Sequence, residues 1–155
     1  MAQVNIALPL APLESPLLAE FMAALDPVNA LADSSPGFVW RLQTEDGNAT
    51  GIRAFEDERL LVNMSVWESI DSLADFVYRS AHVDVMRRRR QWFDHIRMYM
   101  ALWWVPAGHL PSVLEAKERL AHLRAHGPTP VAFTFKARFE PSGESAVADA
   151  IGCPA

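Results

Sequence analysis

The sequence predicts an α+β domain in which an antiparallel sheet carries helices on one face. Three observations lead to this prediction. Strand-length segments that alternate or run apolar recur along the chain, at residues 3–8, 38–43, 60–67, 98–105 and 131–139. Segments with apolar residues at helical spacing separate most of these strands, and turns rich in proline and glycine mark their ends. The order strand, helix, strand, strand, helix, strand, with an extra C-terminal helix and strand, corresponds to the ferredoxin-like arrangement.

The first helix is predicted between the first two strands. Ser15 and Pro16 suit the cap and the first turn of a helix, and an apolar stripe at helical spacing continues to Leu25. Pro27 has no backbone N–H to donate, so we expect it to end or interrupt this helix. Turn residues at 34–37 then lead into the second strand.

The strand at 60–67 has two different faces. The apolar face consists of Leu60, Val62, Met64 and Val66. On the other face, Asn63, Ser65 and Trp67 place an amide, a hydroxyl and an indole beside Leu61. Such a face suits a small-molecule cavity, in which a few polar groups orient a ligand. A half-solvated sheet face or a subunit interface is the alternative.

A helical region from Ser69 to Phe93 follows this strand at once. Ser69 is a candidate N-cap, and Asp71 complements the positive end of the helix dipole. The periodicity allows either one helix or two helices with a bend near His82. We expect the pocket to lie where this region meets the strand at 60–67.

The C-terminal part is predicted to add a strand, a helix and a last strand. Residues 98–105 form an uninterrupted apolar run that suits a central strand. Ser112 and Glu115 have the spacing of a capping box, in which the serine caps the first turn and the glutamate reaches back. This helix is expected to close at Gly127, and the last strand follows at 131–139.

Both faces of the predicted sheet carry apolar and aromatic side chains. Helices cover only one face of a ferredoxin-like sheet, so the other face needs a different partner. Large exposed apolar surfaces are rare on monomers, and a second sheet is a better partner for such a face than water. We therefore expect a homodimer in which two sheets form a shared barrel.

Length and composition favour a single domain at residues 1–140, followed by a loose tail at 141–155. No apolar run reaches the roughly 18 to 20 residues of a membrane span, and the N-terminus lacks the basic region of a secretory signal. The single cysteine, Cys153, cannot form an internal disulfide, which is typical of a cytoplasmic protein. The net charge of −5 argues against general affinity for nucleic acid.

Two motifs carry a resemblance to known families. The motif NMSVWESIDSLADFVYRSAH, with the order of elements, resembles the dimeric α/β-barrel superfamily, specifically the antibiotic-biosynthesis monooxygenases. In those monooxygenases a strand ends in a similar tryptophan, a helix follows it, and a histidine lies further along the sequence. The segment WWVPAGHLPSVLEAKERLAHLRAHGPTPVAFTFKARF resembles more closely a bacterial domain family of unknown function in that superfamily. The resemblance covers residues 4–139 and implies a fold more strongly than an activity.

The resemblance also implies a site. Some of these monooxygenases oxidise polycyclic aromatic substrates without metal or flavin, using an asparagine and a tryptophan four residues apart, a spacing that Asn63 and Trp67 match. Asn63 would hydrogen-bond a substrate carbonyl or phenolate, and Trp67 would pack against the substrate ring. The substrate anion would itself activate dioxygen, so no cofactor is expected. For the tyrosine and basic residues that complete the family's site no clear counterpart is found; Tyr78 and Arg79 are the candidates.

Further candidates lie in the helical region. His82 is a candidate base near neutral pH or a haem ligand, although a histidine at a helix bend more often bonds a backbone carbonyl. The four arginines at 87–90 point in nearly all directions around a helix, so they do not form one basic patch. At least one of them, Arg89 or Arg90, is expected to turn inward and meet a carboxylate or a ligand anion.

Aromatic and histidine side chains complete the candidates. Trp92, Phe93 and Trp103 either line a cavity for a flat substrate or belong to the core. His122 and His126 lie one helical turn apart, a spacing that is compatible with metal binding. No third ligand is evident near them, so no metal site is predicted.

The sequence supports three functional hypotheses. The first is a small enzyme that resembles cofactor-independent monooxygenases and acts on an aromatic or polyketide-like substrate. The second is a non-catalytic ligand- or haem-binding barrel dimer with His82 as the haem ligand, and the third is a non-redox isomerase or cyclase that uses the same pocket. The expected catalytic residues are Asn63, Trp67 and His82, and the expected substrate-binding residues are Tyr78, Arg89, Trp92, Phe93 and Trp103.

Overall fold

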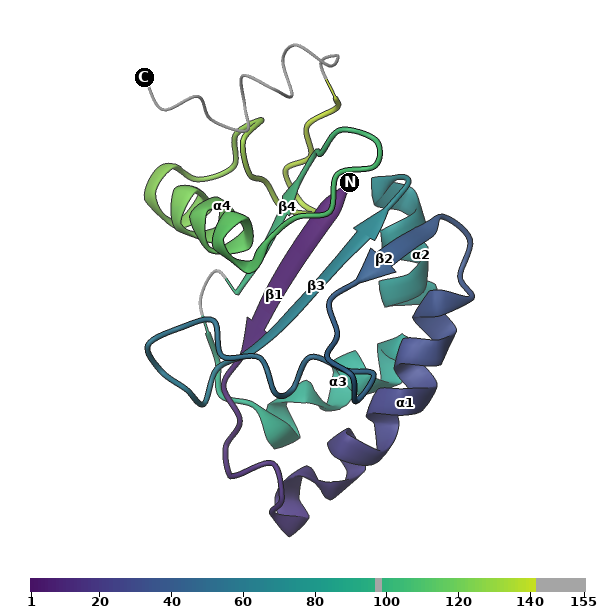
Figure 1. Cartoon of the computed structure of the whole chain (residues 1–155), viewed down its shortest axis with the longest axis vertical. Helices are drawn as coiled ribbons and strands as arrows, with labels where there is room; N and C mark the ends of the chain where they lie inside the picture. The colour runs from purple at the N-terminus through teal and green to yellow at the C-terminus, as the bar shows by residue number, and fades with distance from the viewer. Residues whose placement is uncertain (97–98, 142–155) are drawn as a thin grey trace.

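The computed structural model describes residues 1–96 and 99–141, which form an α+β fold with one four-stranded sheet and four α-helices (Figure 1). The elements follow one another as β1 (Ala2–Ala7), the 3-10 helix η1 (Pro16–Leu18), α1 (Ala19–Asp33), β2 (Phe38–Arg41), β3 (Leu61–Trp67), α2 (Ile70–Arg79), α3 (His82–Trp92), β4 (Met100–Trp103) and α4 (Val113–His126). Of the tail expected to be loose, residues 142–155 lie outside the described residues. None of the described helices is both long and apolar enough to span a lipid bilayer.

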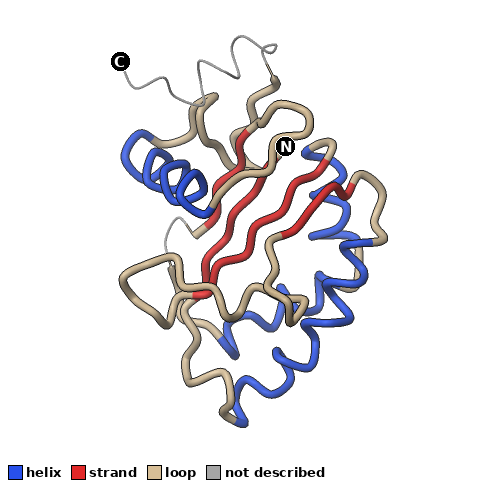
Figure 2. The backbone as a smooth tube through the Cα atoms, viewed as in Figure 1, coloured by secondary structure: helices blue, strands red, loops and turns tan. Residues whose placement is uncertain are grey.

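The sheet has the strand order β2-β3-β1-β4, and every pair of neighbours is antiparallel. Figure 2 shows the four strands side by side and the long loop that joins β2 to β3. Val4 lies opposite Met64 and Ala101, whereas Asn5 lies opposite Asn63. Because side chains alternate along a strand, Val4, Met64 and Ala101 share one face, and the two asparagines share the other.

The face that carries Val4 is packed against α4. Leu120 and Leu123 of this helix join Val4, Met64 and the other buried apolar residues of that face in one cluster. Figure 1 shows α4 well apart from α1, α2 and α3. The expectation that helices cover only one face is therefore wrong, because the extra C-terminal helix covers the second one. Burial of that face needs no second chain, so the argument for a shared barrel from two apolar faces no longer applies.

The first helix continues through Pro27, which was expected to end or interrupt it. A proline inside a helix removes one backbone hydrogen bond, at a cost of about 3 kcal/mol. The helix continues because it packs on both sides of the proline, with Leu25, Val28 and Ala32 facing the sheet side of the molecule. Tertiary packing therefore outweighs the local stop signal.

The helical region after β3 consists of two helices. The Oγ of Ser69 accepts a hydrogen bond from the backbone N–H of Ser72 at 3.0 Å, which confirms the predicted N-cap. α2 ends at Arg79, and Ser80 is extended (φ −105°, ψ −179°) before α3 begins at His82. Of the two alternatives that the periodicity allowed, the bend near His82 is the one observed.

The cap of α4 confirms half of the predicted capping box. The Oγ of Ser112 accepts a hydrogen bond from the backbone N–H of Glu115 at 3.1 Å. The carboxylate of Glu115 does not reach back to Ser112; it accepts the indole N–H of Trp103 at 2.9 Å and lies 2.7 Å from Nε2 of His109. α4 ends at His126, and Gly127 follows as its C-cap with a positive φ of 71°, which glycine adopts without strain.

The predicted strand at 131–139 is wrong. Within these residues only Phe133 is bridged to the sheet, by two backbone hydrogen bonds with Leu102 of 2.8 and 2.9 Å. The chain turns on both sides of this bridge, where the N–H of Thr129 bonds the carbonyl of Ala132 and the N–H of Ala137 bonds Oγ1 of Thr134. The apolar alternation therefore reflects the burial of single aromatic rings rather than a strand.

Candidate functional site

A cavity of about 210 Å³ lies between the sheet face that carries Asn63 and the helices α1, α2 and α3. Its position agrees with the expectation that the pocket lies where β3 meets the helices that follow it. Most of the lining side chains are apolar, and the polar or charged ones come from strands, helices and loops: Gln3, Asn5, Asn29, Arg41, Asn48, Thr50, Asn63, Ser65, His82, Arg89 and Asp94. A mainly apolar cavity with a few convergent polar groups is the usual form of a small-molecule site.

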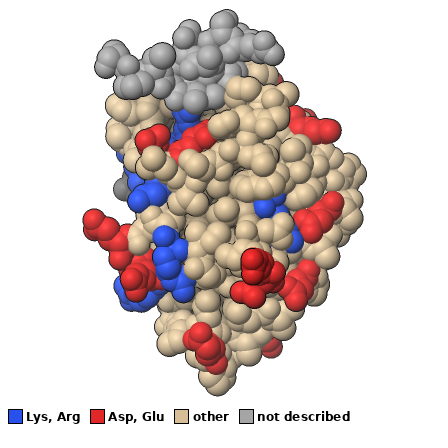
Figure 3. All heavy atoms as spheres, in the orientation of Figure 1, with Lys and Arg blue, Asp and Glu red and all other residues tan. Residues whose placement is uncertain are grey.

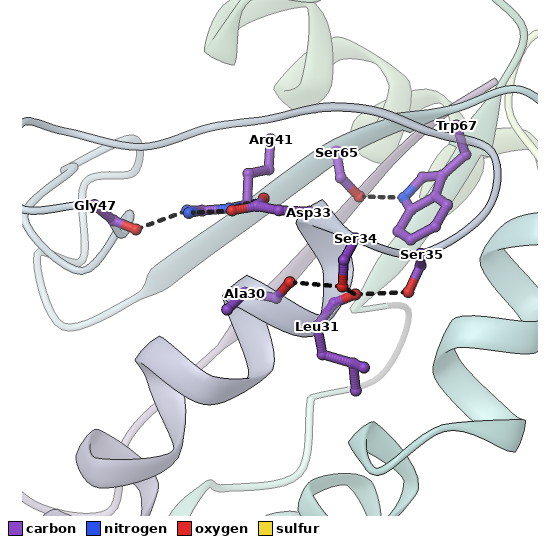
Figure 4. Close-up of polar contacts among 9 residues, drawn as sticks. All are labelled: Ala30, Leu31, Asp33, Ser34, Ser35, Arg41, Gly47, Ser65 and Trp67. Carbon is purple, nitrogen blue, oxygen red and sulfur yellow. Dashed lines mark hydrogen bonds and ion pairs between the residues drawn. The ribbon is translucent and has the colours of Figure 1, made fainter.

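Four side chains of β1 and β3 form a hydrogen-bonded polar row along the sheet side of this cavity. Nε2 of Gln3 donates to Oδ1 of Asn63 at 2.8 Å and to Oγ of Ser65 at 2.9 Å. The same Ser65 oxygen accepts the indole N–H of Trp67 at 2.8 Å (Figure 4). This polar row, Gln3, Asn63, Ser65 and Trp67, arises because Gln3 lies directly opposite Ser65 in the strand register and reaches both side chains.

Asn63 is the exposed member of the polar row. Its side chain is open to the cavity, whereas Gln3, Ser65 and Trp67 are buried. Its Nδ2 has no hydrogen-bond partner among the described residues, and neither has the side chain of Asn5, which lies opposite it on β1. The two amides therefore supply free hydrogen-bonding groups to a ligand.

Trp67 is a core residue rather than an open platform. It is only 1% exposed, and the Phe76 ring stacks on it with centroids 5.2 Å apart and planes at 25°. Phe38 meets it edge-on at 5.4 Å, and its N–H is used by Ser65. In this arrangement Trp67 holds the hydroxyl of Ser65 in place, and its ring has no free face for the substrate stacking that the resemblance implies.

His82 lies at the start of α3 and lines the cavity. Its Nδ1 lies 3.3 Å from the carbonyl oxygen of Val77, and its backbone N–H bonds Oγ of Ser80 at 3.1 Å. A carbonyl only accepts, so Nδ1 carries the proton and Nε2 has a free lone pair. Burial lowers the pKa of His82 below its ordinary value, against the opposing effect of the Val77 hydrogen bond. The neutral imidazole is thus available as a proton acceptor, or as a ligand, at Nε2.

Arg89 is the one arginine of the run at 87–90 that lines the cavity. Arg87 pairs with Asp84 and Arg88 pairs with Glu20, whereas the guanidinium of Arg89 lies 4.0 Å from the centroid of the Tyr99 ring. Within residues 1–96 and 99–141 no carboxylate forms an ion pair with Arg89. Figure 3 shows basic and acidic side chains interspersed on the visible face of the molecule. Arg89 is thus the arginine of the run that turns toward the cavity, and its expected pairing with a ligand anion stays a prediction.

The remaining candidates divide into two groups. Tyr78 and Phe93 line the cavity, although Tyr78 is more than half exposed and burial raises the pKa of its hydroxyl. Trp92 and Trp103 do not line it. Trp92 packs against Phe21 with centroids 5.7 Å apart, and Trp103 lies on the α4 face of the sheet, so both belong to the core alternative.

Sequence reasoning missed Gln3 and Asn5. Both lie on β1 and point to the same face as Asn63, because Gln3 is paired with Ser65 and Asn5 with Asn63. The signal was present as two polar residues at alternate positions of a short strand, the pattern that singled out β3. The pairing of β1 with β3 places these two polar residues beside Asn63 and Ser65, and the sequence of one strand does not predict its pairing partner.

Arg41 lines the cavity, and its guanidinium group is bonded to other residues of the chain. Its Nε donates to Oδ1 of Asp33 at 2.7 Å and its Nη1 donates to the carbonyl of Gly47 at 2.7 Å (Figure 4). These bonds join α1, β2 and the β2–β3 loop at the edge of the cavity. Because Asp33 compensates its charge, Arg41 has a structural role at the edge of the cavity and is not a free cation for a ligand.

Metal-binding side chains do not gather in the described part of the chain, where no group of three or more His, Cys, Asp or Glu could hold an ion. The rings of His122 and His126 lie 4.5 Å apart, and Nε2 of His122 lies 2.9 Å from Oγ1 of Thr129. The contact with the threonine hydroxyl uses one of the two ring nitrogens of His122.

A family model described as "Domain of unknown function (DUF3291)" matches residues 1–149, so the chain belongs to this family. A search of curated proteins found no match. The family description names no activity, and the function therefore has to be argued from the cavity and its side chains.

Proposed function

Starting from a domain family without an assigned activity, we propose that this chain is a small enzyme that binds a compact aromatic substrate in the cavity and oxidises it with dioxygen, without a cofactor. The observation that carries the proposal is the exposed amide of Asn63 at the end of a buried polar row in an otherwise apolar cavity. Apolar walls accommodate a ring, and the amide of Asn63 orients a carbonyl or phenolate oxygen.

The order of elements supports the superfamily part of this proposal. With α2 and α3 counted as one helical unit, β1 to β4 follow the order strand, helix, strand, strand, helix, strand. The strand order β2-β3-β1-β4 with antiparallel neighbours supports the proposal of a ferredoxin-like sheet. We therefore extend the proposal to kinship with the antibiotic-biosynthesis monooxygenases, to which the sequence motif also points.

The proposed reaction converts a ring methylene and dioxygen into a ring carbonyl and water. His82 takes the acidic proton of the substrate at Nε2, because burial lowers the pKa of His82 and keeps its imidazole neutral beside the cavity. Asn63 stabilises the resulting enolate by donating from Nδ2. The carbanion reduces dioxygen and forms a C–O bond with it, and the resulting peroxide anion takes the proton back from His82. The hydroperoxide then loses water, because its O–O bond and the second C–H bond of the ring carbon break, and the carbonyl remains.

The volume of the cavity limits the size of the substrate that can bind. Its volume of about 210 Å³ is below the range of about 300–1,000 Å³ that is typical of drug-sized ligands. A substrate of one or two rings therefore suits it better than a polycyclic one. Haem ligation by His82 is the second candidate. The free Nε2 of that residue favours it, whereas the small volume of the cavity counts against a group as large as a porphyrin.

Haem and substrate oxidation are separated by one measurement on the purified protein. An absorbance spectrum recorded with and without added haem is expected to lack a Soret band that depends on His82. A Soret band that His82→Ala removes would replace the enzymatic proposal with haem binding. A non-redox isomerase or cyclase would instead convert a substrate without consuming oxygen.

The test of the enzymatic proposal is oxygen uptake with a panel of one- and two-ring phenols and cyclic ketones. Asn63→Ala is expected to abolish uptake while the circular dichroism spectrum stays that of the folded protein. Gln91→Ala, at an exposed position of α3 outside the cavity, is the matched control and should keep full activity. Unchanged uptake in Asn63→Ala would contradict the proposal.

The homodimer is a separate proposal. The superfamily resemblance supports it, whereas the α4 face no longer requires a second sheet. Light scattering on the purified chain tests it, since a dimer has twice the 17.3 kDa mass of one chain.

A further inference from the structure

We propose that Gln3 determines which ligands the cavity accepts, because its amide bonds the oxygens of Asn63 and Ser65 and thereby leaves the N–H groups of Asn63 and the O–H of Ser65 free for a ligand. The cavity should therefore select a ligand that presents an acceptor oxygen, such as a carbonyl, phenolate or carboxylate. This inference rests on the proposed function only in that the cavity binds a small molecule. It does not depend on which reaction, if any, follows binding.

Ser65 supplies the first donor. A hydroxyl has two lone pairs and one proton. Both acceptor positions of the Ser65 oxygen are filled, by the indole N–H of Trp67 at 2.8 Å and by Nε2 of Gln3 at 2.9 Å. Indole can only donate, so the direction of that bond is fixed. What remains on Ser65 is its O–H, and no acceptor for it lies among the described side chains.

Asn63 supplies the second donor. Its Oδ1 accepts from Nε2 of Gln3 at 2.8 Å, which fixes the orientation of the amide group. The Nδ2 of Asn63, with two N–H bonds, then lies on the other branch of the amide and is unpaired in the described chain. Because Asn63 is exposed to the cavity, a ligand acceptor can reach these N–H groups.

Gln3 controls both donors at once. It is buried, lies directly opposite Ser65 in the register, and uses both N–H bonds of its amide on the two β3 side chains. A side chain at position 3 that only accepts hydrogen bonds would reverse the direction of both bonds. Ser65 and Asn63 would then donate to residue 3, and their oxygen lone pairs would face the ligand. The chemistry at position 3 therefore decides the class of ligand.

The variant Gln3→Glu performs this reversal with a side chain of nearly the same shape. A carboxylate has no donor and accepts from both Ser65 and Asn63. Gln91→Glu is the matched control, since it makes the same change from amide to carboxylate at an exposed position of α3 outside the cavity. The side chain of Gln91 accepts from Arg88 and forms no hydrogen bond with the polar row, so the control leaves that row unchanged.

The probes are acetophenone and α-methylstyrene, which differ only in a carbonyl oxygen replaced by a methylene group. Their affinities are measured by titration of the ¹⁵N-labelled chain followed by NMR. Acetophenone is expected to bind about tenfold more tightly to the wild-type protein, the effect of one well-placed hydrogen bond. It should also shift the side-chain NH₂ resonances of Asn63 more than those of Gln3. Gln3→Glu should reduce the preference to less than about twofold, whereas Gln91→Glu should keep it.

The outcomes separate this inference from the proposed function. Equal affinities of the two probes, with shifts of cavity resonances, would overturn the inference and leave the binding site intact. A preference that survives in folded Gln3→Glu would also overturn it. Should that variant fail to fold, Gln3→Met removes the same two bonds without a charge and should also lower the preference. Absence of binding by either probe would contradict the proposed function itself.

Discussion

Trp103 and Trp67 are both fully buried in the same sheet, on opposite faces, and both have their indole N–H satisfied. Trp103 donates to Glu115 of α4, so its hydrogen bond ties a helix to the sheet. Trp67 donates to Ser65 two residues away, so its hydrogen bond ties neighbours on one strand together. The first bond holds two elements of the fold in contact, whereas the second positions side chains for a ligand.

The same difference extends to the two faces as a whole. The face covered by α4 is filled by apolar side chains that are almost completely buried, and it forms one continuous cluster with that helix. The opposite face carries the polar row and leaves a cavity beneath α1, α2 and α3. We infer that the α4 face supplies most of the stability of the sheet and that the cavity face supplies the binding chemistry. Four substitutions test this division.

The largest effect is expected from Leu120→Ala on α4. Leu120 is buried in the cluster of the α4 face, so its truncation removes apolar contacts and leaves a void. The free energy of unfolding should fall by about 2–5 kcal/mol in a urea titration. Leu114→Ala on the same helix is the control, because Leu114 is 64% exposed, and it should change stability by less than about 0.5 kcal/mol. Similar effects of the two changes would contradict the division.

Gly37→Ala tests the contact that holds α2 beside β2. Gly37 has a φ of +80°, and a Cβ atom there would lie 2.2 Å from Oγ of Ser72. The combined strain and clash should cost about 1–3 kcal/mol, measured as a loss of unfolding free energy. Gly47→Ala has a similar φ of +82° and no atom within 4 Å of the added Cβ, so it isolates the backbone part of the cost. Equal losses in both variants would show that the contact with Ser72 is unimportant.

The stability of the cavity face should depend on pH through His82. Burial lowers the folded-state pKa of His82 below the ordinary value of 6.5. The unfolded chain therefore binds the proton more readily, and stability is highest above pH 6.5 and falls as the pH decreases toward the folded pKa. His82→Gln should make the fall of stability between neutral and mildly acidic pH shallower by at most about 1.4 kcal/mol per pH unit. His95→Gln, at an exposed position, is the control and should leave the slope unchanged; a parallel profile in His82→Gln would rule out this role.

The smallest change of stability is expected from Asn63→Ala, although this substitution should have the largest effect on ligand binding. Asn63 is exposed to the cavity, and its Nδ2 bonds no other described residue. Loss of its one bond from Gln3 should change the unfolding free energy by no more than about 1 kcal/mol. Chemical denaturation measures this change. A larger loss would place Asn63 among the residues that hold the fold together.

Local signals predicted the elements of this fold well. Ser69 and Ser112 cap the helices that follow them, Gly127 ends α4, and β3 extends from Leu61 to Trp67 almost as its alternation predicts. Each of these features depends on a few neighbouring residues, whose backbone hydrogen-bonding needs are the same in any fold. The cavity side of β3 was predicted for the same reason, since alternation alone separates Asn63 from Met64.

Long-range contacts decided what the local signals could not. Pro27 lies within a helix because packing on both sides of it outweighs its local cost. The aromatic residues at 131–139 bury their rings separately and do not form a strand of the sheet, since among these residues only Phe133 is bridged to it. Glu115 has the spacing of a capping box, yet its carboxylate is used by Trp103 and His109, which tertiary folding brings to it.

The sequence by itself determined the composition of each strand face, because side-chain alternation is a property of an extended chain. It therefore identified Asn63 and Ser65 as residues of one face. Only the tertiary structure decided that β1 lies beside β3 and places Gln3 between these two side chains. It also decided that Trp67 is enclosed by Phe38 and Phe76, and that α4 rather than a second chain covers the opposite face. The physical reason is that hydrogen-bond direction and burial are set by partners distant in sequence, which no local pattern records.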